Sequence, residues 1–192
     1  MAQAVNIFAS NFDPLRAEEF YKAWLVPSVR RDLANNKKLN VHLYDSLKKA
    51  LYKTNAWFKG VMFELCDEHT TSKEVKVVES ILSKMSIPVI SASVAMLKLM
   101  DLPPSSPAIH YLSALLNKHY TLPKRVLTRL QEYLLSFINY EGELSVAWHC
   151  LVLTLAKQYS QSLDEMAKSA LADLSKAKNH KLITPEILKH LQ

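Results

Sequence analysis

Residues 144–159 read LSVAWHCLVLTLAKQY, and this segment decides the fold class that we expect for the chain. Its apolar residues fall on nearly every side of a helix, which is typical of a helix that neighbouring helices cover all round. Gly142 breaks the chain just before this segment. The segment therefore predicts a central helix in a helical protein.

Outside this segment, the sequence lacks the turn residues that β-sheets require. Two glycines, Gly60 and Gly142, occur in 192 residues, and the eight prolines stand mostly where helices would begin. Tight hairpin turns depend on glycine, so this composition disfavours a sheet. We predict an all-α fold in which antiparallel helix pairs stack side by side, as in HEAT or armadillo solenoids.

The first helix start is predicted at Asp13, which can cap a helix whose first residue is Pro14. Residues 1–12 show no periodic pattern, and we expect them to form a loose lead-in to a single helical domain of residues 13–192. Pro27 is expected to interrupt the first helix, because proline lacks a backbone donor and its ring clashes with the preceding turn.

Two later helix starts carry the spacing of a capping box, in which a Ser or Thr precedes a Glu by three residues. Thr71 with Glu74 is the first, and Ser162 with Glu165 is the second. Both pairs precede residues with helical apolar spacing, so each predicts the start of a helix.

Positive charge is concentrated between Arg30 and Lys59, a segment that we call the basic stretch. It contains eight Lys or Arg and two acids, a net charge of +6, which equals the net charge of the whole chain. The remaining residues therefore sum to zero, and the charge forms a local patch. A concentrated positive field attracts polyanions, and nucleic acid is the first partner to consider.

Some of these cations have a structural explanation in the sequence. Asp45 precedes Lys49 by four residues, the favoured order for a helical ion pair. Lys37 and Lys38 fall near a predicted helix end, where cations stabilise the helix dipole. The predicted RNA-binding residues are Arg30, Arg31, Lys37, Lys38, Lys48, Lys53, Lys59, Lys124 and Arg125.

A solvated charged face is the alternative interpretation of the basic stretch. Trp57 and Tyr52 lie between the cations, and aromatic rings in such a position either stack on bases or pack in the core. For Trp57 we expect a core position, because Phe58 and Val61 share its helical turn.

Catalysis finds little support. Two glycines cannot build a phosphate-binding loop or a nucleophile elbow, and the seven histidines show neither a His-Glu-x-x-His pair nor a zinc-ligand spacing. His149 and Cys150 are helix neighbours that point about 100° apart, so a core histidine with a satisfied ring is favoured over a nucleophile and its base. We expect no enzyme activity, no cofactor and no metal.

Five segments together resemble the bystin family. They follow one another in order and read VPSVRRDLANNKKLNVHLYDSLKKALYKTNAWFKG (residues 26–60), SIPVISASVAMLKL (86–99), YTLPKRVL (120–127), LSVAWHCLVLTLAKQY (144–159) and ITPEI (183–187). The resemblance extends from about Phe20 to Ile187 and so covers nearly all of the chain.

The resemblance implies a non-enzymatic assembly factor of the small (40S) ribosomal subunit that supports 18S rRNA maturation. Its implied partners are precursor rRNA, small-subunit ribosomal proteins and other assembly factors, and its implied location is the nucleolus and nucleus, with late particles in the cytoplasm. We expect a monomer and no membrane contact. Family members usually have a polar N-terminal region that this sequence lacks. A helical scaffold that binds only proteins is the alternative.

Overall fold

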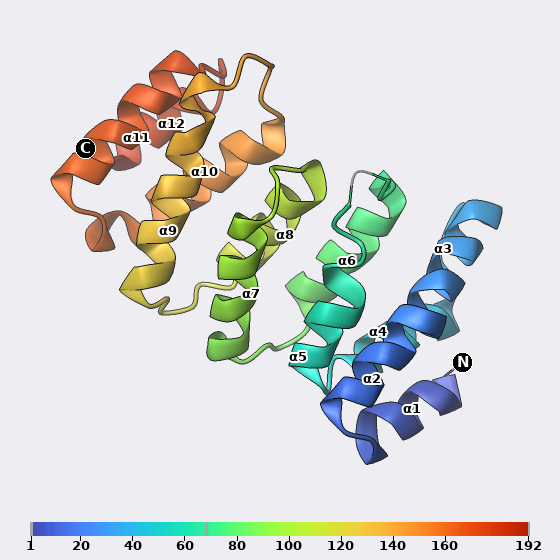
Figure 1. Cartoon of the computed structure of the whole chain (residues 1–192). Coiled ribbons are helices and arrows are strands. Elements are labelled where there is room, and N and C mark those ends of the chain that lie inside the picture. The colour runs from blue at the N-terminus through green and yellow to red at the C-terminus, as the bar shows by residue number, and fades with distance from the viewer. Residues whose placement is uncertain (1, 68, 192) are drawn as a thin grey trace. The chain divides into compact units, whose positions relative to one another are not determined.

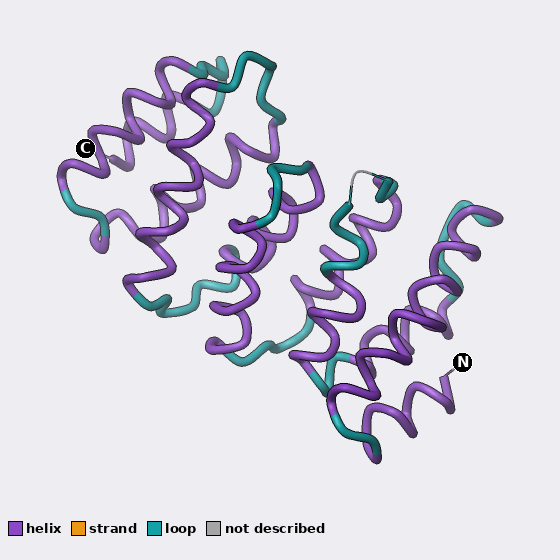
Figure 2. Tube along the Cα trace, viewed as in Figure 1, coloured by secondary structure: helices purple, strands orange, loops and turns teal. Residues whose placement is uncertain are grey.

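In the computed structural model, which describes residues 2–67 and 69–191, all regular structure is helical, as the helix and loop colours of Figure 2 show. The all-α prediction is confirmed. The chain divides into two compact units, Met1–Ser91 (unit 1) and Ala92–Gln192 (unit 2). The stacking of helix pairs along one solenoid, and the single domain of residues 13–192, stay predictions.

Unit 1 consists of α-helices, which Figure 1 labels α1 to α6, and two π-helical segments. Its elements are α1 (Ala2–Asn11), α2 (Pro14–Phe20), the π-helix η1 (Tyr21–Leu25), α3 (Val26–Asn35), α4 (Val41–Ala50), α5 (Thr54–Trp57), the π-helix η2 (Phe58–Met62) and α6 (Ser72–Lys84).

Helix α1 occupies the segment for which we expected a loose lead-in, and that expectation is wrong. Val5 and Ala9 lie one turn apart and are buried, and α1 packs against α4. The Phe8 ring stacks on Phe20 with a centroid distance of 4.1 Å. Among the described side chains of α1, Val5 and Ala9 alone are buried, one on each turn, so the apolar periodicity is too weak to recognise without the partner helix.

Pro27 does not interrupt the first helix, because the helical turn just before it is a wider π-helical turn. Val26 donates its N–H to the carbonyl of Tyr21, five residues earlier, and helical structure then continues from Pro14 to Asn35. In a regular α-helix the proline ring would clash with the carbonyl of Ala23. The π-helical turn shifts this carbonyl, and the Ser28 hydroxyl donates to the carbonyl of Trp24 at 2.7 Å.

The π-helical segment η2 packs against η1 and α2, and Gly60 of η2 faces the junction of α2 and η1. A Cβ atom at Gly60 would stand 2.9 Å from the carbonyl oxygen of Glu18 and 3.0 Å from the Cβ of Tyr21. Tyr21 is fully buried, and its hydroxyl donates to the carbonyl of Ala50 at 3.2 Å. Glycine is therefore required at this crossing for a steric reason.

Unit 2 is organised around one apolar helix. Its elements are α7 (Val89–Asp101), which begins just before the boundary, α8 (Ser106–Leu116), α9 (Lys124–Leu135), the 3₁₀ turn η3 (Ser136–Asn139), α10 (Val146–Tyr159), the 3₁₀ turn η4 (Ser160–Ser162), α11 (Glu165–Ala177) and α12 (Thr184–Leu191). Helix α10 packs against both α8 and α12, and Trp148, Leu151 and Leu155 are fully buried. The predicted central helix is confirmed within unit 2.

Of the two predicted capping boxes, the structure confirms one. Thr71 and Glu74 bond reciprocally at the start of α6, with the Thr71 N–H donating to Glu74 Oε2 at 2.6 Å. The box predicted at Ser162 and Glu165 is wrong, because Ser162 lies in η4. Asp164 caps α11 instead and accepts from the N–H of Ala167 at 2.7 Å.

Candidate nucleic-acid interface

The basic stretch runs from α3 through α4 to η2, and its cations separate into groups. Arg31, Lys37 and Lys38 lie on α3 and in the loop before α4, and we call them the loop group. Lys48, Lys49 and Lys53 lie in the last turn of α4 and just after it, and we call them the helix-end group. Helix α4 has 10 residues and spans about 15 Å, so the two groups stand at opposite ends of one helix.

The loop group is exposed, and no carboxylate in residues 2–67 or 69–191 lies within ion-pair distance of its three cations. The acid nearest in sequence, Asp32, is used elsewhere. Its Oδ2 accepts from the N–H of Asn40 at 2.7 Å and its Oδ1 from the side-chain amide of Asn36 at 3.0 Å. Asp32 therefore fixes the shape of the loop and leaves the positive charges of the loop group unpaired.

Arg30, in contrast, has a structural role, although the sequence offered it no neighbouring partner. Its Nη2 donates to the carbonyl of Glu64 at 3.0 Å and to Asp67 Oδ2 at 3.2 Å. Its Nε lies 3.5 Å from Oε1 of Glu74, the buried acid of the confirmed capping box, without hydrogen-bond geometry. These partners lie more than 30 positions away, so only the tertiary fold brings them to Arg30.

The ion pair predicted between Asp45 and Lys49 is wrong, because Asp45 pairs with Lys48 at 2.6 Å. Their hydrogen bond raises the pKa of Lys48 and lowers the pKa of Asp45. The Lys48 ammonium also lies 5.3 Å from the centre of the Tyr44 ring. Lys49 is exposed and has no carboxylate partner among the described residues. Of the two neighbouring lysines, Lys48 is therefore paired and Lys49 is free.

Lys59 shares an acid with Lys22. Its ammonium lies 3.9 Å from Glu18 Oε2, while Lys22 lies 2.9 Å from Glu18 Oε1. The hydrogen bond to Glu18 raises the pKa of Lys22. Lys59 is more than half exposed, so this long contact leaves most of its charge in solvent.

The helix-end group borders a surface pocket of about 600 Å³ within unit 1. Lys48, Lys49 and Tyr52 line it together with residues of α1, among them Asn6 and Ser10. Tyr52 is 79% exposed, so its ring is available to a ligand. Sequence reasoning missed the contribution of α1, because it assigned that segment no structure.

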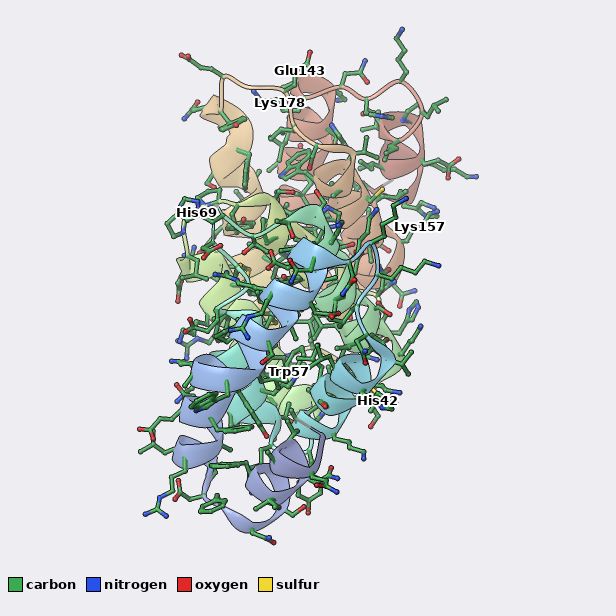
Figure 3. The ribbon with its side chains drawn as sticks, turned by 90° about the vertical axis from the view of Figure 1, so that its right-hand side faces the viewer. His42, Trp57, His69, Glu143, Lys157 and Lys178 are labelled. Atoms are coloured by element: carbon green, nitrogen blue, oxygen red, sulfur yellow. The ribbon has the colours of Figure 1, made fainter. Side chains whose placement is uncertain are left out.

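The tryptophan that is exposed in unit 1 is Trp24, at 63%, on the π-helical segment η1. Trp57, labelled in Figure 3, is 0% exposed and donates through Nε1 to the carbonyl of Leu47 at 3.1 Å. The expected core position of Trp57 is confirmed. Trp24 escaped notice because it stands inside an apolar run, although it lies off the buried positions Tyr21, Leu25 and Val29.

Lys124 and Arg125 belong to unit 2, where both are exposed in the first turn of α9. They line a pocket of about 550 Å³ with Arg129, whose guanidinium is held by Asp101 at 3.1 Å and Glu132 at 3.5 Å. Cations at a helix N-terminus oppose the helix dipole, so an anion bound there would stabilise α9. The two residues form a basic site of their own within unit 2.

Within the described residues, no three His, Cys, Asp or Glu side chains are grouped so that they could hold a metal ion. No helix in the described part of the chain has both the length and the apolar character needed to cross a membrane.

The described part of the chain is all-helical, and the loop group forms an exposed basic surface on unit 1. A family described as Bystin matches residues 1–192. The chain is 45% identical to Bystin from Rattus norvegicus and to Bystin from Homo sapiens, in each case over 193 aligned positions that cover all of this chain and 44% of the relative. It is 36% identical to Bystin from Arabidopsis thaliana over 99% of this chain and 43% of the relative.

The chain belongs to the Bystin family. It spans less than half the length of the curated relatives named above.

Proposed function

We propose that this chain is part of a non-enzymatic assembly factor of the small (40S) ribosomal subunit, which binds precursor particles and supports 18S rRNA maturation. The family relationship supports the broad class of protein. The observation that carries RNA binding is the loop group: Arg31 on α3 and Lys37 and Lys38 in the following loop are exposed and have no acidic partner among the described residues. Exposed cations without an acidic partner bind phosphates without first breaking an ion pair of the protein.

RNA would be recognised through its backbone and shape. The loop group and the helix-end group are separated by the length of α4, so each can contact a different stretch of backbone. Tyr52 is exposed beside the helix-end group and offers a ring for stacking on a base. Arg30 and Lys48 contribute to the field, but acids of the protein already pair with them. Lys59 makes one long contact to Glu18 and keeps most of its charge in solvent.

The partners that we propose are precursor rRNA, small-subunit ribosomal proteins and other 40S assembly factors. The proposed location is the nucleolus and nucleus, with late particles in the cytoplasm, and we propose a monomer.

A scaffold that binds only proteins is the second candidate, and the pocket of about 600 Å³ lined by α1 and Tyr52 favours it. A peptide held there would bind without a strong dependence on salt.

A charge-reversal variant tests RNA binding. Arg31, Lys37, Lys38 and Lys53 are replaced together by glutamate, and affinity for structured RNA is measured as a function of salt. Four phosphate contacts contribute about −2.8 to −3.6 to the slope of log affinity against log salt, and we expect the variant to lose measurable binding. Arg30 is left unchanged, because its loss would leave the buried Glu74 without its cation.

A matched control carries the same change in net charge elsewhere. This control replaces four exposed lysines together by glutamate: Lys76, Lys157, Lys176 and Lys189. We expect a much smaller loss of affinity than for the variant of Arg31, Lys37, Lys38 and Lys53. Equal losses in the two variants would mean that net charge alone attracts RNA. A slope near zero in the unmodified chain would leave the protein-only scaffold as the better proposal.

A further inference from the structure

One end of unit 2 contains a pocket of about 770 Å³ that the proposed RNA contacts do not use. It lies between the segment that precedes α10, the start of α10 and the segment that joins α11 to α12. Two histidines and two lysines line it, His149, His180, Lys178 and Lys181, and Glu143 is the acid among its lining residues. Glu143 and Lys178 are labelled in Figure 3.

His149 is the group that sets this pocket apart. Its side chain is 4% exposed, yet its Nδ1 has no hydrogen-bond partner, and its ring makes no hydrogen bond within residues 2–67 and 69–191. The sequence predicted a core histidine with a satisfied ring, and the structure contradicts the satisfied ring. A buried polar group without a partner is costly, so such groups often mark a site that a ligand completes.

His180 provides a second donor beside it. The rings of His149 and His180 lie 5.1 Å apart. The Nδ1 of His180 accepts from the backbone N–H groups of Leu182 at 3.4 Å and Ile183 at 3.3 Å. With Nδ1 accepting these two bonds, the ring proton of His180 lies on Nε2, and this N–H has no partner among the described residues.

The charges around the pocket favour an anion. Lys178 donates to the carbonyl of Tyr140, which occupies one of the three N–H groups of its ammonium. Lys181 and Glu143 are exposed, and Glu143 forms no ion pair with either lining lysine among the described residues. Burial, followed by the neighbouring His180, lowers the pKa of His149, so its ring is neutral near pH 7 and donates through a single N–H.

We propose that this pocket binds the carboxylate side chain of a glutamate or aspartate in a peptide segment of a partner protein. The two oxygens of a carboxylate accept from the two imidazole N–H groups, while Lys178 and Lys181 supply the opposite charge. A phosphate is less well matched, because no arginine lines the pocket and a buried, neutral imidazole offers one donor. The proposal does not depend on RNA binding by the loop group.

The test uses the whole chain with ¹⁵N-labelled histidines and two small probes. The first probe is the tripeptide acetyl-Ala-Glu-Ala-amide, and the second is acetyl-Ala-Gln-Ala-amide, which has the same shape without the charge. We expect saturable shifts of the His149 and His180 ring signals with the glutamate peptide. The glutamine peptide should bind at least about tenfold more weakly, since it loses one charge-assisted pair.

Substitutions then locate the site. Lys178→Gln should weaken binding of the glutamate peptide several-fold, and Glu143→Gln should strengthen it, because a like charge is removed from the rim. Lys157→Gln is the matched control, since Lys157 is exposed in the same unit and does not line this pocket; Figure 3 labels both lysines. His149→Phe should abolish the peptide-induced shift of the His180 ring signals. The backbone amide signals of the labelled histidines should show that the chain remains folded.

Several outcomes would overturn the proposal. Equal binding of the two peptides, equal loss in Lys178→Gln and Lys157→Gln, or the absence of a saturable histidine shift would each do so. Inorganic phosphate that binds more tightly than the glutamate peptide would identify a phosphate site instead. None of these results depends on RNA, so failure here and failure of the proposed RNA contact are distinguishable.

Discussion

Trp57 and Trp24 occupy opposite extremes of exposure within unit 1, and the difference follows from their helical positions. The Trp57 indole fills the core and satisfies the carbonyl of Leu47 near the end of α4, where backbone acceptors lack helical partners. Trp24 projects into solvent from the π-helical turn and covers little apolar surface.

We predict that Trp57→Ala lowers the free energy of unfolding by about 3–5 kcal/mol, through the cavity and the unsatisfied carbonyl that it leaves. Trp24→Ala is the matched control and should cost less than about 0.5 kcal/mol. Urea unfolding followed by circular dichroism measures both. Similar losses in the two variants would contradict the burial difference.

His149 is expected to reduce stability in the unliganded chain, because its buried ring lacks a partner. Replacing it with phenylalanine, which has a similar shape and no polar atom, should raise the free energy of unfolding by about 1 kcal/mol. Chemical denaturation near neutral pH provides the measurement. A loss of stability would show instead that the ring is satisfied in solution, for example by a bound water.

The pKa of His149 adds a pH dependence to this prediction. Burial lowers its pKa in the folded state below the ordinary value of 6.5, so the unfolded chain binds more protons between the two values. The proton-linked cost of burying His149 is therefore absent above pH 6.5, and stability is lost as the pH falls from 6.5 toward the folded pKa. His149→Phe should flatten this part of the stability profile.

At the scale of elements, the crossing of η1 and η2 depends on a close backbone approach. Gly60 faces the carbonyl of Glu18, which is main chain and cannot move aside like a flexible side chain. We predict that Gly60→Ala separates the two segments and lowers the free energy of unfolding by about 1–3 kcal/mol.

Gly142→Ala is the control for this substitution. The Cβ would meet the ring of Tyr140, a half-exposed side chain that can rotate away, so the cost should be much smaller. Thermal or urea unfolding of the two variants compares them directly. Equal stability of Gly60→Ala and the unmodified chain would mean that the crossing tolerates a methyl group.

At the scale of the whole molecule, the candidate RNA contacts are distributed over both units. The loop group and the helix-end group belong to unit 1, and Lys124 with Arg125 belongs to unit 2. Contacts at separate sites contribute nearly independently to a binding free energy. A long RNA that touches both units should therefore show the sum of their salt dependences.

We predict that Lys124→Glu with Arg125→Glu reduces the magnitude of the salt slope by about 1.4–1.8, the share of two phosphate contacts. The slope of the unmodified chain is the reference, because the variant of Arg31, Lys37, Lys38 and Lys53 is expected not to bind measurably. Titration of one structured RNA at several salt concentrations gives both slopes. An unchanged slope in the double variant would confine the RNA contact to unit 1.

The sequence by itself determined the helical class, the central place of α10 in unit 2, the capping box at Thr71 and the core position of Trp57. Each of these depends on chemistry within a few helical turns, such as glycine content, apolar periodicity or a cap three residues from its partner. Such local relations can be read in the order in which they occur along the chain. Helix α1 was not predicted because its formation depends on packing against α4. The continuous helical structure across Pro27 was not predicted because it depends on a π-helical turn.

Only the tertiary structure decided which cations are free. Arg30 pairs with Glu74 and Asp67, more than 30 residues away, and Lys59 lies near Glu18 at a similar separation in sequence. Among the described residues, Arg31, Lys37 and Lys38 have no acidic partner, because Asp32 is used in bonds that hold their loop. The same is true of His149, whose ring is buried beside His180 without a hydrogen bond. Charge and hydrogen-bond partners depend on distance in space, and the order of residues along the chain does not fix that distance between remote segments.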